Sequence, residues 1–208
     1  MSSELERQLR EYSGQYITDL ELGALLKGTQ YAISSQIKRA VKAGLLIHVR
    51  RGLYCLGGYL ARNKPSAYVL ATRIYGPSYI SFESALSYYG LIPEAVYTVT
   101  SATILRTKTF STPLCEFSYL HIPLSHAHFL CEVEIAGHGD NAFFIASPWK
   151  ALCDYALCYK ENNFSRMVGS LRLSLDELPQ LDSSRVQELK KYYATPRINF
   201  IFQEMERF

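Results

Sequence analysis

The sequence predicts an α+β protein in two parts. A small helical unit that ends in a β-hairpin is expected over residues 1–60, and a mixed α/β domain with a helical tail over residues 61–208. Three observations lead to this prediction. Two helix patterns and two strand patterns follow one another near the start, strand patterns alternate with capped helix patterns beyond residue 80, and the charge changes abruptly between the parts.

The first part opens with a helix signal. Thr18-Asp-Leu-Glu21 has the spacing of a capping box and predicts a helix from Asp19 to about Lys27. Residues 27–29 then suit a tight turn, and a second helix is expected from Gln30 to Ala43. Gly44 is a stop signal, because glycine readily adopts the left-handed conformation that ends many helices.

A β-hairpin is expected directly after the second helix. Residues 45–49 and 53–56 are short apolar runs on either side of the turn sequence Arg50-Arg51-Gly52. Helix, turn, helix and hairpin in this order are the plan of a winged helix-turn-helix. Gly57-Gly58 and the change of charge place the end of this domain near residue 60.

The second part has the signals of one mixed α/β domain, without an internal repeat or a low-complexity linker. Ser147-Pro148 and Thr195-Pro196 both put a capping residue before a proline at the favoured first helical position, and Ser81 is a further predicted N-cap. Helices are expected at residues 82–90, 147–159, 165–173, 184–193 and 195–208, with a short piece near Asp176, and strands at 97–104, 115–123, 132–136 and 142–146.

The basic residues are concentrated in one stretch of the chain. Residues 1–21 and 83–208 each carry a net charge of −3, whereas residues 22–82 contain no acid. The nine cations of that stretch are Lys27, Lys38, Arg39, Lys42, Arg50, Arg51, Arg62, Lys64 and Arg73. Such a stretch creates a positive potential that a polyanion would feel. Charge alone favours this interpretation no more than an ordinary solvated basic surface.

The pattern of the second helix favours double-stranded DNA as the polyanion. The side opposite its apolar stripe carries residues suited to phosphates and base edges, namely Tyr31, Ser35, Lys38, Arg39 and Lys42. Arg50 and Arg51 at the hairpin tip could reach a phosphate or a narrow minor groove. Winged helices also serve as protein–protein modules, but the basic helix side and the two arginines together favour DNA binding.

Three segments resemble those of a known family. Val49-Arg-Arg-Gly-Leu-Tyr54, Tyr79-Ile-Ser-Phe-Glu-Ser-Ala-Leu-Ser-Tyr-Tyr-Gly-Leu91 and Ile145-Ala-Ser-Pro-Trp-Lys-Ala-Leu-Cys-Asp-Tyr155 look like segments of the AbiEi family. Its members are the antitoxin halves of abortive-infection type IV toxin–antitoxin pairs. With the helix-turn-helix, the matching segments cover about residues 18–160 in the family's order. The tail beyond 160 and the helical extension before Gly14 depart from the family's pattern.

The resemblance implies two functions. The winged helix would bind operator DNA and repress its own operon, and the C-terminal domain would counter a nucleotidyltransferase toxin encoded alongside, with or without direct contact. A winged-helix regulator whose C-terminal domain senses a small ligand is the alternative. An enzyme, such as a degenerate nuclease that uses the winged helix for targeting, is a third possibility from a different class.

A metal site is not expected. His121, His126 and His128 form the one histidine cluster, and two histidines two apart on a strand would share a face. A loop with hydrogen-bonded imidazoles is the favoured interpretation, since no Cys, Asp or Glu lies at a usual ligand spacing. We therefore predict neither a metal nor a cofactor.

Catalytic motifs are also weak. Glu188-Leu-Lys190 fits a loose nuclease element, but it falls in a predicted exposed helix rather than on a strand. Gly169-Ser170 followed by Asp176 lacks the Asp-x-Asp pair that a nucleotidyltransferase needs for its metal ions. The sequence thus predicts no catalytic residues and a protein that is not an enzyme.

Cysteine usage and hydropathy bear on the compartment. The five cysteines are scattered without a C-x-x-C pair, which suits a reducing compartment. No apolar run reaches the length of a membrane span, and the charged start lacks the apolar core of a signal peptide. These features predict a cytoplasmic protein without membrane contact.

Overall fold

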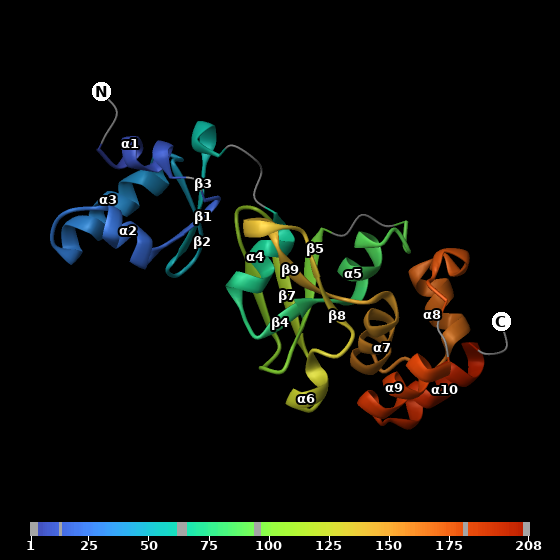
Figure 1. Ribbon diagram of the computed structural model, residues 1–208. Helices are drawn as coiled ribbons and strands as arrows, with labels where there is room; N and C mark the ends of the chain where they lie inside the picture. Colours follow the sequence, from blue (N-terminus) through green and yellow to red (C-terminus); the bar gives the residue numbers. More distant parts are fainter. Residues whose placement is uncertain (1–3, 13, 62–65, 94–96, 181–182, 206–208) are drawn as a thin grey trace. The chain divides into compact units, whose positions relative to one another are not determined.

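The computed structural model divides the chain into two compact units (Figure 1). Unit 1 comprises Met1–Leu70 with Ser111–Cys115, and unit 2 comprises Ala71–Phe110 with Glu116–Phe208. Each contains helices and a sheet, so the predicted α+β class is confirmed. The predicted domain boundary falls at the end of a short 3₁₀ helix, η1 (Gly58–Leu60). The residues that the structure describes are 4–12, 14–61, 66–93, 97–180 and 183–205.

Unit 1 combines helices with an antiparallel sheet in the strand order β1-β3-β2. Its described elements before η1 are α1 (Glu4–Glu11), β1 (Tyr16–Thr18), α2 (Asp19–Leu25), α3 (Gln30–Lys42), β2 (Leu46–Arg50) and β3 (Leu53–Leu56). The two predicted helices and the predicted hairpin are confirmed, with ends that differ by one or two residues. Strand β1 was not predicted, because three residues are too few to show an alternation of apolar and polar side chains. It forms by pairing with β3.

The predicted caps explain where α2 and α3 begin. The Thr18 side chain accepts a hydrogen bond from the Glu21 amide at 3.2 Å, and the Glu21 carboxylate accepts one from the Thr18 amide at 2.7 Å. Thr29 caps α3 by accepting a bond from the Ala32 amide at 3.3 Å. Gly44, with φ of +73°, follows the end of α3 in the left-handed conformation.

The core of unit 1 lies between the three helices and the sheet. Helix α3 contributes Ile33, Ile37 and Ala40, the stripe expected from its sequence, whereas Val41 from the same predicted stripe is only partly buried. The other buried members are Leu5, Leu9, Ile17, Leu22, Leu26, Leu46, Tyr54, Leu56 and Leu60. Two of these come from α1, so the N-terminal extension is part of this core.

The remaining described elements build unit 2, with the first turn of α4 assigned to unit 1. They are α4 (Ala67–Ile74), β4 (Ser78–Ile80), α5 (Phe82–Tyr88), β5 (Thr98–Thr103), β6 (Lys108–Ser111), β7 (Glu116–His121), α6 (His126–Phe129), β8 (Val133–Ala136), η2 (Gly139–Asn141), β9 (Phe143–Ala146), α7 (Pro148–Cys158), α8 (Phe164–Leu171), η3 (Leu175–Glu177), α9 (Ser183–Tyr193) and α10 (Pro196–Met205). Among the described residues, no helix has both the length and the apolar character that crossing a membrane requires.

The sheet of unit 2 is mixed, as predicted. Its strand order is β6-β7-β5-β4-β9-β8, with β5 parallel to β7 and β4 parallel to β9. Strands β4 and β5 pair antiparallel, as do β8 and β9. Helices α5 and α7 pack against each other and contact this sheet through β5 and β9 (Figure 1).

Most of the expected elements of unit 2 are confirmed, and five of its described elements, namely α4, β4, β6, α6 and η2, were not expected. Strand β4 is three residues long and wholly buried in the middle of the sheet, so it shows no alternation of apolar and polar residues. Strand β6 is exposed and α6 has four residues, whereas α4 starts after Ser66, whose hydroxyl accepts a hydrogen bond from the Val69 amide at 3.5 Å as an N-cap does. The conformation of β4 depends on the neighbouring strands that it meets in the sheet, whereas the cap of α4 is a local signal that was missed in the sequence.

A buried polar cluster joins α7 to β4 and α9. Asp154 is fully buried, and its carboxylate accepts hydrogen bonds from the hydroxyls of Tyr79 at 3.0 Å, Ser81 at 2.7 Å and Tyr193 at 2.5 Å. Lys150 lies one turn earlier on α7 with 1% of its surface exposed. Its ammonium is 5.0 Å from the centre of the Tyr79 ring and 5.4 Å from that of Tyr193.

The cluster brings together two segments that lie far apart in the sequence. Tyr79 and Ser81 come from the segment 79–91, and Lys150 and Asp154 from the segment 145–155. Ser81 occupies the predicted N-cap position of α5, but its hydroxyl bonds Asp154 instead of capping the helix. Burial, and then the adjacent Asp154, hold the pKa of Tyr79 and of Tyr193 well above the usual value, so both hydroxyls keep their protons and can donate.

Candidate nucleic-acid interface

One side of α3 presents a row of polar side chains to solvent. Tyr31, Ser35, Lys38 and Lys42, here called the α3 row, follow the i, i+4, i+7, i+11 spacing that aligns side chains along a helix. Tyr31 is 86% exposed, both lysines are exposed, and Ser35 is half-buried. The buried stripe of α3 points the opposite way into the core, which leaves the row available to a partner.

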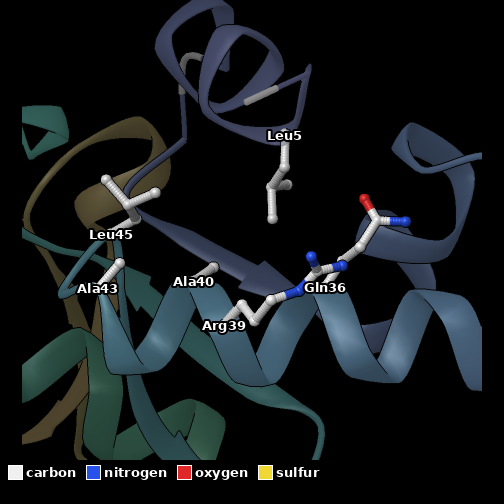
Figure 2. Close-up of a pocket in the computed structure, with 6 residues that line it drawn as sticks. All are labelled: Leu5, Gln36, Arg39, Ala40, Ala43 and Leu45. Atoms are coloured by element: carbon white, nitrogen blue, oxygen red, sulfur yellow. The ribbon is translucent and has the colours of Figure 1, made fainter. Parts of the chain in front are cut away.

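Arg39 lies beside this row rather than within it. Its Nε donates a hydrogen bond to the Ser35 carbonyl at 3.4 Å, and Figure 2 shows its side chain running along α3 toward Gln36. There it borders a pocket of about 300 Å³ between α1 and α3, whose walls include Leu5 and Leu45. Arg39 is exposed, so its guanidinium can still reach a phosphate next to the row.

A second hollow borders the other flank of the row. This pocket, of about 180 Å³, is lined by Lys38, by Asp19 at the start of α2 and by Tyr54 of β3, among others. Burial, and then the neighbouring Asp19, raise the pKa of Tyr54. Asp19 therefore places a hydrogen-bond acceptor beside the row. From the sequence, Asp19 is expected only at the start of a helix, and the capping-box pattern does not indicate that Asp19 also lies beside Lys38.

The two hairpin arginines lie at an anchored turn. Arg50 ends β2, Arg51 follows it, and both side chains are exposed. Gly52 has φ of +78°, which suits glycine, and its carbonyl accepts a hydrogen bond from the Asp19 amide at 3.1 Å. The hairpin tip, residues 50–52, is thus tied to the first residue of α2. The same bond fixes the arginines relative to the helices of unit 1.

The cations of this surface have no internal ion pairs among the described residues. Within the described part of the chain, no carboxylate pairs with Lys38, Arg39, Lys42, Arg50 or Arg51. By contrast, four other arginines form ion pairs: Arg7 with Glu4, Arg10 with Glu6, Arg166 with Glu161 and Arg185 with Glu132. The Asp19 carboxylate lies beside Lys38, but no ion pair holds any of these five cations, so an anion can bind them without first breaking an internal pair.

The basic stretch of the sequence extends beyond this surface. Arg73 belongs to unit 2, whereas Lys27 belongs to unit 1 and is exposed. Arg62 and Lys64 lie outside the described residues. The structure thus brings together the seven predicted contact residues in unit 1, four of them in the α3 row, Arg39 beside it and two at the hairpin tip.

The histidine cluster has a different structure from the one considered for metal binding. His126 and His128 lie on the short helix α6, where residues two apart point in different directions, so they neither share a strand face nor lie in the loop that was the favoured prediction. The His128 ring packs 5.2 Å from that of Tyr192, and His121 Nδ1 lies 3.0 Å from the Leu105 carbonyl oxygen. Among the described residues, no group of three or more His, Cys, Asp or Glu side chains could hold a metal ion.

The weak catalytic motifs fall on helical segments. Glu188 and Lys190 lie on α9, with Glu188 exposed as expected from the sequence. Gly169-Ser170 is within α8, and Asp176 belongs to the short helix η3. None of these residues lies on a strand beside a second carboxylate, which is the arrangement that metal-dependent phosphoryl chemistry uses.

Comparison with known proteins assigns neither a family nor a function to the chain. The sequence matches no protein-family model and no curated protein. The interpretation of the α3 and hairpin surface therefore depends on its geometry and its charge.

Proposed function

We propose that the protein is a DNA-binding transcriptional autorepressor and the antitoxin of a type IV toxin–antitoxin pair. In this proposal α2, α3 and the β2–β3 hairpin form a winged helix-turn-helix, with α3 as the recognition helix and residues 50–52 as the wing tip. The observation that carries it is the α3 row, with three exposed side chains and the half-buried Ser35, flanked by Arg39 and by two wing arginines, without internal ion pairs among the described residues.

The dimensions of the α3 row suit the major groove. Tyr31 and Lys42 are eleven residues apart, which is about 16 Å along a helix, against a groove about 12 Å wide. The ends of the row would therefore meet the phosphates on either side of the groove. Ser35 and Lys38 in the middle would meet base edges, where Lys pairs with guanine and Ser bonds several bases.

The wing arginines would supply contacts that do not depend on sequence. Arg50 and Arg51 lie at the tip that is tied to Asp19, and exposed arginines at such a tip pair with phosphates or enter a narrow minor groove. Asp19 itself would disfavour a phosphate near Lys38 and would accept from a base amine there. The arrangement thus divides base reading in the middle of α3 from backbone binding at its ends and at the wing.

The antitoxin role rests on the resemblance to the AbiEi family. The partner toxin would be a nucleotidyltransferase, and unit 2 would counter it without catalysis of its own. The buried cluster of Asp154 supports this reading indirectly. Two of the three segments that carry the resemblance meet there, as expected if they maintain a shared fold rather than a catalytic centre.

A test of the proposed roles compares substitutions on α3 and on the wing. Lys38→Ala is expected to reduce the preference for operator over scrambled duplex by about 1–3 kcal/mol, because it removes a base contact. Arg50→Ala and Arg51→Ala should weaken binding to both duplexes alike, because phosphates carry no sequence information. Competition measured by fluorescence anisotropy checks this, with Lys191→Ala at an exposed position of α9 as the control. An unchanged preference in Lys38→Ala would mean that another surface reads the bases.

A second test separates repression from protection. The double variant Arg50→Ala/Arg51→Ala should derepress the operon and still protect cells from the partner toxin when it is expressed from a foreign promoter. The reason is that both substitutions lie in unit 1, whereas unit 2 has its own sheet and core. Reporter expression and a co-expression growth assay measure the two effects, with Arg106→Ala/Lys191→Ala as a charge-matched control. A folded, abundant double variant that fails to protect would contradict the two-part proposal.

A further inference from the structure

Unit 2 contains a pocket that the proposed function does not use. It has a volume of about 370 Å³, within the range of small-molecule sites. Its polar wall is formed by Glu83 of α5, Tyr155 of α7 and Ser170 of α8, and Ile92 and Leu171 add buried apolar side chains. The three helices come from separate parts of the chain and meet within unit 2 (Figure 1).

The carboxylate of Glu83 is incompletely satisfied. Its Oε2 atom is buried and has no hydrogen-bond partner within the described residues. Burial raises the pKa of the Glu83 carboxyl, against smaller opposing effects of its own backbone and of Tyr159. An unpartnered buried oxygen of this kind costs free energy that a donor would recover. The terminal torsion of glutamate is soft, so a small rotation can turn Oε2 toward a donor in the pocket.

The other polar groups of the pocket offer acceptors. The Thr98 hydroxyl donates to Glu116 at 3.3 Å, and the Ser170 hydroxyl donates to the Met167 carbonyl at 3.1 Å. Because its proton is already used, the Thr98 oxygen keeps its lone pairs for a ligand donor, whereas the Ser170 side chain also hydrogen-bonds Tyr155. No lysine, arginine or histidine is among the described residues that line the pocket. Its electrostatics therefore favour a cation and disfavour an anion.

We infer that this pocket binds a small organic cation, whose ammonium group pairs with Glu83 and whose apolar body packs on Ile92 and Leu171. A carboxylate and hydroxyl oxygens can together accept the three protons of a primary ammonium. The buried apolar side chains supply the non-directional part of the binding free energy. This inference is independent of DNA binding, because every residue involved belongs to unit 2.

Three probes of the same shape and different charge test the inference on the full chain. Benzylamine should bind with a Kd of about 1 mM or below, benzyl alcohol more weakly, and benzoate not measurably. Glu83→Gln removes the charge with little change of shape and should weaken benzylamine binding by about tenfold or more. It should leave benzyl alcohol binding unchanged. Isothermal titration calorimetry at neutral pH measures all of these, with Glu188→Gln on exposed α9 as the matched control.

Several outcomes would overturn the inference. Equal affinity for benzylamine and benzyl alcohol, or unchanged benzylamine affinity in Glu83→Gln, would show that the carboxylate does not select a cation. If benzylamine gives no binding heat at concentrations up to about 10 mM, the pocket does not bind it and the inference is wrong. If Glu83→Gln fails to fold, Ser170→Phe provides a second variant, because it places a ring at the pocket wall from an exposed position of α8. That variant should abolish benzylamine binding, and retained binding would also contradict the inference.

Discussion

Replacement of Asp154 by alanine is expected to lower the free energy of unfolding of unit 2 by about 3–5 kcal/mol. The substitution removes the acceptor of three buried hydroxyls, those of Tyr79, Ser81 and Tyr193. It also leaves the buried ammonium of Lys150 without the carboxylate one turn away on α7. A loss of this size is a large share of the about 5–15 kcal/mol that stabilises most domains.

The chain's single tryptophan makes this prediction simple to measure. Trp149 is buried on α7, one residue before Lys150, so its fluorescence during urea unfolding reports on unit 2. Asp154→Asn should lower the free energy of unfolding by less than Asp154→Ala does, because the amide oxygen still accepts hydrogen bonds. Asp140→Ala, at an exposed position in η2, is the control and should change stability by less than about 0.5 kcal/mol. If Asp154→Ala and the control unfold at the same urea concentration, the cluster does not stabilise the fold.

A strong dependence of DNA affinity on salt is the second large expected effect. Arg39, Lys42, Arg50 and Arg51 are exposed and would meet phosphates in the proposed function, and each phosphate neutralised contributes about −0.9 to the slope of log K against log salt. Four contacts for each bound chain give a slope of about −3.6, so the affinity should fall about 150-fold between 50 and 200 mM salt. Anisotropy of a labelled duplex from the region upstream of the gene measures it. A flat salt dependence would contradict binding through these cations.

The sequence predicts those elements whose signals are local. The capping box at Thr18 and the Ser147-Pro148 start of α7 both form as their residues imply, because a cap needs partners only three residues away. The exposure of the α3 row also follows from the sequence, since the helical period separates it from the buried stripe.

Other features depend on residues far apart in the chain. Asp154 meets partners 75, 73 and 39 positions away, so no spacing rule connects them. Strand β4 is defined only by its neighbours β5 and β9. The same limit applies to the pocket at Glu83, whose walls come from α5, α7, α8, strand β5 and Ile92.

The candidate DNA surface itself was only partly predictable. The helical wheel groups Arg39 with the α3 row. In the structure its side chain bonds the Ser35 carbonyl and lines the pocket beside α1, so Arg39 lies at the edge of the row. Asp19 was missed as a neighbour of Lys38, because it reaches that position through the packing of α2 against α3 and through its bond to Gly52. Both differences arise from packing between elements, which local pattern does not determine.

The most direct test of the central claim compares salt slopes of matched double variants on the upstream duplex. Lys42→Ala/Arg51→Ala removes one cation from the α3 row and one from the wing, so the slope should become shallower by about 1.8. Arg106→Ala/Lys191→Ala removes the same charge from exposed positions of unit 2 and should keep the wild-type slope. Equal slopes for the two double variants would contradict the claim that α3 and the wing bind the DNA backbone.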